Sequence, residues 1–142
     1  MKKNIFLIIL TLNFSVYAEN AVKIEKIQNN FIQNIYSDSV KGKNSLELLK
    51  SYADKELKYA IELNDKISKN GEVCLDYDPL WESQDPKKNV PLSITSHKNK
   101  VFVKFLQNKD KTEVIFTVKC LQNNKCSISD VNDLKSIILG CQ

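Results

Sequence analysis

Arginine is absent from this sequence, so all 21 of its basic residues are lysine. An arginine guanidinium can form two parallel hydrogen bonds to a phosphate group or a guanine edge, and a lysine ammonium cannot. The formal net charge is only +4, and the lysines are spread along the chain instead of forming one basic run. We therefore expect no nucleic-acid partner.

Histidine and glycine are scarce, which argues against common catalytic and nucleotide-binding motifs. The only histidine, His97, lies in a polar segment that we interpret as an exposed hairpin tip. No G-x-S-x-G motif accompanies it, as a nucleophilic triad would require. The three glycines, at 42, 71 and 140, are too scattered to form a phosphate-binding loop. We expect a protein that is not an enzyme, has no catalytic residues and binds no cofactor.

Long apolar runs are missing too. The apolar run at residues 5–12 is shorter than the roughly 20 residues that span a membrane. Two lysines precede it, and the small-x-small sequence at residues 16–18 follows it. This pattern predicts a secretory signal peptide over residues 1–18, cleaved before Glu19. A buried N-terminal helix is the alternative, but it leaves the lysines unexplained.

No cysteine stands near the predicted cleavage point, so we expect no lipid anchor and no stable membrane anchor. The protein is then periplasmic or secreted, with residues 19–142 forming a single domain. All four cysteines lie in this part, and an even number of cysteines in an oxidising compartment predicts disulfides. A metal site is the disfavoured alternative, because it calls for closer C-x-x-C pairs or histidine partners.

The spacing of the cysteines favours one of the three possible pairings. Cys120 and Cys126 flank a five-residue connection between two strand-like runs. An odd-length connection places two flanking residues opposite each other on the same face of a hairpin. We therefore predict a Cys120–Cys126 bridge, which leaves Cys74 to pair with Cys141.

Hydrophobic periodicity predicts three helices in the first half of the mature chain. Apolar residues recur at steps of three and four over residues 21–36. Ser45 is the expected N-cap of a second helix that continues to residue 52. Asp54 is the expected N-cap of a third, over residues 55–68.

The period then changes to two, and four strand-like runs follow at residues 92–96, 101–106, 113–120 and 126–131. A short helix over residues 133–139 closes the chain. Phe102, Leu106 and Ile115 indicate that the second face of the sheet is partly covered as well. The fold class is α+β, with N-terminal helices packed on a curved, cone-like, four-stranded antiparallel sheet. Its concave face is the natural place for a cleft.

The irregular connection at residues 73–86 combines carboxylates with aromatic rings: Asp76, Tyr77, Asp78, Trp81, Glu82 and Asp85. One hypothesis makes these six residues a binding loop that presents an acidic aromatic surface to a basic partner. A second makes the segment structural, with Asp78 capping a turn at Pro79 while Leu80 and Trp81 fill the core. A catalytic or metal-binding role is the least favoured, since an EF-hand would need a different spacing and a glycine.

The tyrosines leave two interpretations open. Together with Trp81, the rings at 36, 52, 59 and 77 could line a concave pocket for a small ligand. Tyr52 and Tyr59 are one heptad apart, which is typical of core residues. We prefer core packing, with the hydroxyl groups reaching the rim.

Several short motifs resemble exported bacterial proteins of the domain-of-unknown-function family 3828. They are residues 76–80, residues 84–85, residues 101–103, residues 113–116 and residues 126–131. The resemblance implies a fold similar to nuclear transport factor 2, an exported location and no established catalytic activity. In the last motif Cys126 stands where the family usually has tryptophan, and Ser129 stands at its first aspartate. Roles that depend on those two family residues do not carry over.

These features predict an exported periplasmic binding protein that is not an enzyme and whose partner is another protein. A concrete form is an immunity protein that blocks a toxin or cell-wall hydrolase delivered into the periplasm. The alternative is a small-molecule carrier or sensor that uses the concave cleft of the sheet.

Overall fold

The computed structural model describes the backbone of residues 5–121 and 123–141, and the side chains in those ranges from residue 19 onward. Lys2 and Lys3, which open the predicted signal peptide, lie outside the described residues. Cleavage before Glu19 stays a prediction.

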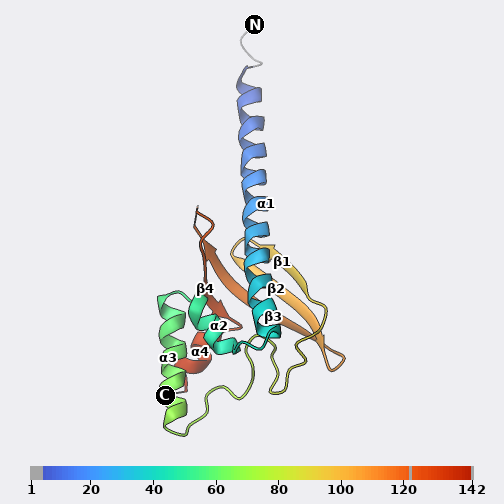
Figure 1. Cartoon of the computed structure of the whole chain (residues 1–142). Coiled ribbons are helices and arrows are strands. Elements are labelled where there is room, and N and C mark those ends of the chain that lie inside the picture. Colours follow the sequence, from blue (N-terminus) through green and yellow to red (C-terminus); the bar gives the residue numbers. More distant parts are fainter. Residues whose placement is uncertain (1–4, 122, 142) are drawn as a thin grey trace.

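The first helix, α1, runs from Ile5 to Val40 and is longer at both ends than the sequence predicts. No glycine or proline interrupts this stretch, so nothing in the chain breaks the helix early. Gly42, with φ +95°, takes the left-handed conformation just beyond its end. Figure 1 shows the first half of α1 extending away from the domain and the second half lying against the sheet.

Two shorter helices follow, α2 over Ser45–Tyr52 and α3 over Lys55–Lys69. The expected cap of α3 is confirmed, since Asp54 accepts a hydrogen bond from the Leu57 amide at 3.0 Å. The expected cap of α2 is wrong by one residue, because Asn44 accepts from the Glu47 amide at 3.1 Å. Ser45 is buried inside the helix start and bonds elsewhere.

The four strands are β1 (Ser93–His97), β2 (Lys100–Gln107), β3 (Asp110–Cys120) and β4 (Cys126–Val131). They form one antiparallel sheet in the order β1-β2-β3-β4. The last helix, α4, covers Leu134–Leu139. The α+β class, the four-stranded antiparallel sheet and the short C-terminal helix are thus confirmed.

Strands β2 and β3 are longer than predicted, because a two-residue turn joins them. Asn108 and Lys109 both have positive φ, 51° and 79°. Turns of that handedness match the twist of paired strands, and asparagine tolerates the left-handed region well. Residues 107–112, which lie between the two predicted strands, are therefore mostly strand.

The core lies between the helices and one face of the sheet, which we call the inner face. Its strands contribute fully buried side chains at Val101, Val103, Val114, Phe116 and Val118. Helix α1 contacts β1, β2 and β3, while α2, α3 and α4 gather beside β4. On the outer face Phe102 and Ile115 are half-buried and Leu106 is 55% exposed, so that face is only partly covered.

Both predicted disulfides are present. Cys120 and Cys126 face each other at the end of the β3–β4 hairpin, with their Cα atoms 4.0 Å apart. Cys74 and Cys141 join the segment after α3 to the end of α4 across 67 positions of sequence. Two disulfides are compatible with a periplasmic or extracellular protein.

Candidate functional site

The acidic loop, by which we mean residues 76–85, is anchored in the core by two fully buried side chains, Leu80 and Trp81. The Trp81 indole donates a hydrogen bond to the Ser39 hydroxyl at 2.9 Å. The Tyr36 hydroxyl donates to the Leu80 carbonyl at 2.7 Å, and its ring packs edge-on against Trp81 at 5.0 Å. Burial raises the pKa of Tyr36 well above its ordinary value, so the hydroxyl stays protonated and donates.

Asp78 organises the backbone of this loop. One carboxylate oxygen accepts from the Leu80 amide at 3.0 Å, and the other accepts from the Ser45 hydroxyl at 2.8 Å. The Lys88 ammonium lies 3.3 Å from the same carboxylate. Asp78 therefore caps the turn at Pro79, as the structural interpretation of this segment predicts, and Ser45 serves the loop instead of its own helix.

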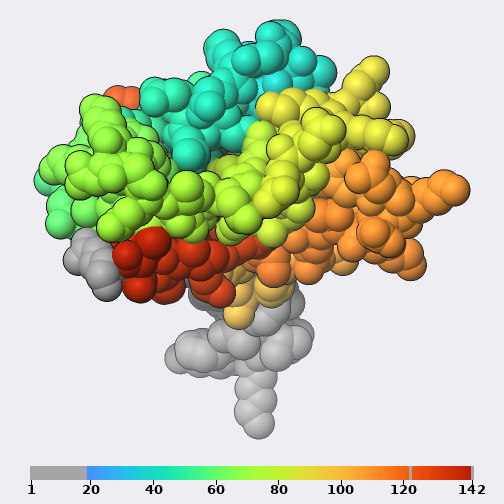
Figure 2. Space-filling view, turned by 90° about the horizontal axis from the view of Figure 1, so that it is seen from below, coloured from blue at the N-terminus to red at the C-terminus, as the bar shows by residue number. Residues whose placement is uncertain are grey.

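The other four predicted site residues of the loop lie at or near the surface. Asp76, Glu82 and Asp85 are exposed and Tyr77 is half-buried. Figure 2 shows the loop, in yellow-green, on the lower face of the domain between the green helix α3 and the orange β2–β3 turn. The six residues thus divide into Trp81, which is fully buried, Asp78, which is half-buried and hydrogen-bonded within the fold, and a surface group of four.

Tyr77 lies among carboxylates. Its pKa is raised, first by partial burial and then by the negative charges of Glu82 and Asp76. Asp76 accepts a hydrogen bond from the Gln84 amide group at 2.9 Å. Partial desolvation raises the pKa of the Glu82 carboxyl, although the residue as a whole is exposed. An aromatic ring flanked by fixed carboxylates suits a basic group.

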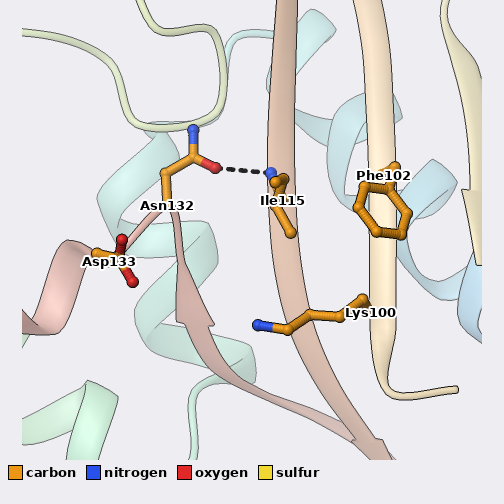
Figure 3. Close-up of a pocket in the computed structure, with 5 residues that line it drawn as sticks. All are labelled: Lys100, Phe102, Ile115, Asn132 and Asp133. Carbon is orange, nitrogen blue, oxygen red and sulfur yellow. Dashed lines mark hydrogen bonds between the residues drawn. The ribbon is translucent and has the colours of Figure 1, made fainter. Parts of the chain in front are cut away.

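Asn132, which no sequence pattern singled out, joins the acidic loop to the outer face of the sheet. Its side-chain amide donates to Glu82 at 2.8 Å and accepts from the Ile115 amide at 2.7 Å. Figure 3 shows Asn132 and Asp133 beside a cleft of about 420 Å³, with Phe102, Ile115 and Lys100 as its other lining residues. The only local signal was an Asn-Asp pair after a strand, two residue types that tolerate the positive φ found at both positions.

The predicted cleft on the inner face is filled. Tyr36, Trp81, Phe105 and Phe116 occupy the space between α1 and the strands, and none is more than 5% exposed. Their rings meet edge-on at centroid distances of 5.0 to 6.4 Å. Such packing leaves these rings unable to line a ligand cavity without moving.

Core packing is confirmed for Tyr36 and wrong for Tyr59, which is 59% exposed. Tyr52 is 38% exposed and packs edge-on against Phe31 at 5.3 Å. Tyr52 ends α2 whereas Tyr59 belongs to α3, so the two residues do not share a helix face despite their heptad spacing.

His97 is exposed at the end of β1, opposite Lys100, as the hairpin interpretation predicts.

Among the described residues no group of three or more histidine, cysteine, aspartate or glutamate side chains could hold a metal ion. In the part of the chain whose side chains the structure describes, no helix is long and apolar enough to cross a membrane.

In comparisons with known proteins, no family model, curated protein or solved structure matches this chain.

Proposed function

We propose that this chain is an exported, non-enzymatic protein-binding domain whose interface includes the surface part of the acidic loop. In its specific form it is an immunity protein, made by a bacterium to block a toxin or cell-wall hydrolase that reaches its own periplasm. The observation that carries the proposal is the setting of Tyr77, a half-buried aromatic ring on a core-anchored loop, whose pKa is raised by partial burial and by the charges of Glu82 and Asp76.

The loop is organised before any partner arrives. The buried Trp81 ring anchors the loop through its bond to Ser39, and Asp78 accepts the hydrogen bond that closes the turn. The hydrogen bond from Asn132 holds Glu82 beside the outer face of the sheet. A surface that is already ordered loses little conformational entropy on binding, so more of each contact contributes to affinity.

The surface charges indicate the chemistry of the partner. Asp76, Glu82 and Asp85 present three carboxylates, while the nearby Lys88 is engaged by Asp78. Interface hot spots are mostly tryptophan, tyrosine and arginine, and Tyr77 is the loop aromatic that reaches the surface. The expected partner surface therefore carries lysine or arginine that contacts the carboxylates and the face of the tyrosine ring.

Two further parts of the proposal concern location and fold. The disulfides support export to an oxidising compartment. Helices on the inner face of an antiparallel sheet support a fold like nuclear transport factor 2. Membership of the exported family that the motifs resemble rests on those motifs alone. Because aromatic rings fill the inner face, we favour protein binding over the carrier hypothesis.

The test is capture from periplasmic extract, or with the product of a neighbouring effector gene, followed by binding kinetics. A triple variant, Tyr77→Ala with Asp76→Asn and Asp85→Asn, should slow association by lost charge and quicken dissociation by lost contact. Loss of a tyrosine hot spot alone corresponds to about 2 kcal/mol, or roughly a thirtyfold weaker affinity.

The matched control is Tyr59→Ala with Glu56→Gln and Glu62→Gln, which removes one tyrosine ring and two carboxylate charges on α3. It should bind as the wild type does. If the loop variant melts like the wild type and also binds like it, the acidic loop is not the interface and the proposal fails.

A further inference from the structure

A second surface lies at the other end of the domain, where the β3–β4 hairpin stands beside α1. Two adjoining clefts, of about 360 Å³ and about 620 Å³, share Leu121 and Asn124 as lining residues. We call them together the hairpin groove. In Figure 1 the hairpin tip lies beside the middle of α1, whereas the acidic loop lies at the opposite end of the domain.

One face of α1 lines the groove with apolar side chains. Ile24, Ile27 and Phe31 follow each other at steps of three and four, so they lie along the same side of the helix. Leu121 lines the opposing wall and is 67% exposed, and Ile24 is 45% exposed. Exposed apolar side chains gathered in one groove indicate a surface that another molecule covers.

The charged residues that line the two clefts have a single sign. Lys23, Lys119 and Lys125 line the two clefts, and no aspartate or glutamate does. All three lysines are exposed, and within the described residues none of them forms an ion pair. The groove is therefore complementary to a segment that carries carboxylates beside apolar side chains.

The Cys120–Cys126 bridge forms part of this groove, since Cys120 lines one cleft and Cys126 the other. The bridge closes a loop of only six positions, which constrains the unfolded chain much less than the Cys74–Cys141 bridge does. Its position indicates a local role, in which it holds the hairpin end as a rigid wall before a ligand arrives.

We propose that the hairpin groove binds an acidic amphipathic segment of a partner protein, with apolar side chains against Ile24, Phe31 and Leu121 and carboxylates near the lysines. This inference is independent of the acidic-loop proposal, because it concerns an opposite charge at the opposite end of the molecule. If both hold, the domain contacts two partner surfaces of opposite charge.

The test uses protein purified from the periplasm of an export-competent host and a fluorescent helical peptide with leucines on one face and glutamates on the other. Anisotropy titration should show binding that weakens as salt is added. Lys119→Glu with Lys125→Glu should weaken binding by at least about tenfold. Leu121→Ser should weaken it at unchanged salt dependence, and Cys120→Ser with Cys126→Ser should weaken it through loss of the wall.

The matched control is Lys58→Glu with Lys111→Glu, which changes net charge equally at exposed positions outside the groove. This control should bind the peptide normally, and the same peptide with lysine in place of glutamate should not bind. If a hairpin variant fails to fold, Lys23→Glu on α1 replaces it and must show a weakening of its own.

Three results would overturn the inference. In the first, folded groove variants bind the peptide as tightly as the wild type does. In the second, the protein ignores the peptide but binds phosphatidylglycerol vesicles through the same lysines, so the groove faces a membrane. In the third, sedimentation shows a dimer that Leu121→Ser dissociates, so a second copy occupies the groove.

Discussion

The acidic loop and the β3–β4 hairpin end are both irregular connections at the surface, and they are made rigid in different ways. The acidic loop is fixed by noncovalent bonds that reach far along the chain: Trp81 to Ser39, Leu80 to Tyr36 and Glu82 to Asn132. The hairpin end is fixed by the disulfide between Cys120 and Cys126 and by short-range hydrogen bonds such as that from the Leu121 amide to the Lys125 carbonyl. The loop thus depends on the whole fold, whereas the hairpin depends mainly on itself.

This difference has a consequence for stability. Bonds that anchor the acidic loop also hold α1 and the sheet together, so damage to the loop should lower global stability. Damage to the hairpin end should leave most of the fold intact and change only local order. Substitutions in the two regions can therefore be ranked in advance.

The largest effect is expected at Trp81. Trp81→Ala removes a fully buried ring from the centre of the aromatic cluster and should lower the free energy of unfolding by about 3–5 kcal/mol. Trp81→Phe keeps most of the ring but loses the bond to Ser39, and should cost less. Urea unfolding followed by circular dichroism measures both. An alanine variant as stable as the wild type would mean that the loop is not anchored through this residue.

The second-largest effect is expected from the disulfides, which should contribute unequally to the free energy of unfolding. In the chain-entropy estimate, a bridge across 67 positions is worth about 4 kcal/mol and one across 6 positions about 2 kcal/mol. Paired replacement of Cys74 and Cys141 by serine should therefore lower the melting temperature more than paired replacement of Cys120 and Cys126. Calorimetry of the two double variants decides this, and the reverse order would contradict the comparison.

A smaller effect separates two acids within the loop. Asp78→Ala removes bonds to the Leu80 amide and the Ser45 hydroxyl and should cost about 2 kcal/mol, as loss of a charged hydrogen-bond acceptor does. Asp85→Ala, at an exposed position of the same loop, should stay within about 0.5 kcal/mol of the wild type. Equal costs in parallel urea titrations would remove the distinction between the hydrogen-bonded and the exposed acids of the loop.

Much of the fold could be predicted because the relevant signals are local. Periodicity located the helices and strands, and the five-residue connection between Cys120 and Cys126 fixed both bridges. Errors arose where neighbouring residues compete for one role. Asn44 and Ser45 are both good caps, and only the tertiary contact of Ser45 with Asp78 shows why Asn44 takes the position.

The surface sites depend on contacts that sequence spacing does not reveal. Asn132 meets Glu82 across 50 positions. The hairpin groove requires α1 to lie beside the end of a hairpin almost a hundred residues later, and no periodicity indicates that neighbourhood. The residue types of the acidic loop were visible in the sequence, and the structural interpretation of the segment correctly placed Asp78 at the turn and Trp81 in the core.

The smallest expected effect concerns the charge of Glu82. Its pKa is raised in the folded state by desolvation, so the folded protein holds this proton more tightly than the unfolded chain does. The ionised carboxylate therefore costs stability above the folded pKa, and that cost disappears as the pH falls below the ordinary pKa of glutamate, about 4.3.

Glu82→Gln removes the charge and keeps an oxygen that accepts from Asn132, so the variant should be slightly more stable at pH 7. Because the residue is exposed and screened by solvent, the gain should stay below about 1 kcal/mol. Urea unfolding at pH 7 and at pH 4 measures it, and the difference between variant and wild type should shrink at the lower pH. A variant that is less stable at pH 7 would show that the Asn132 bond needs the ionised carboxylate, and would make Glu82 an anchor of the loop instead of a surface member.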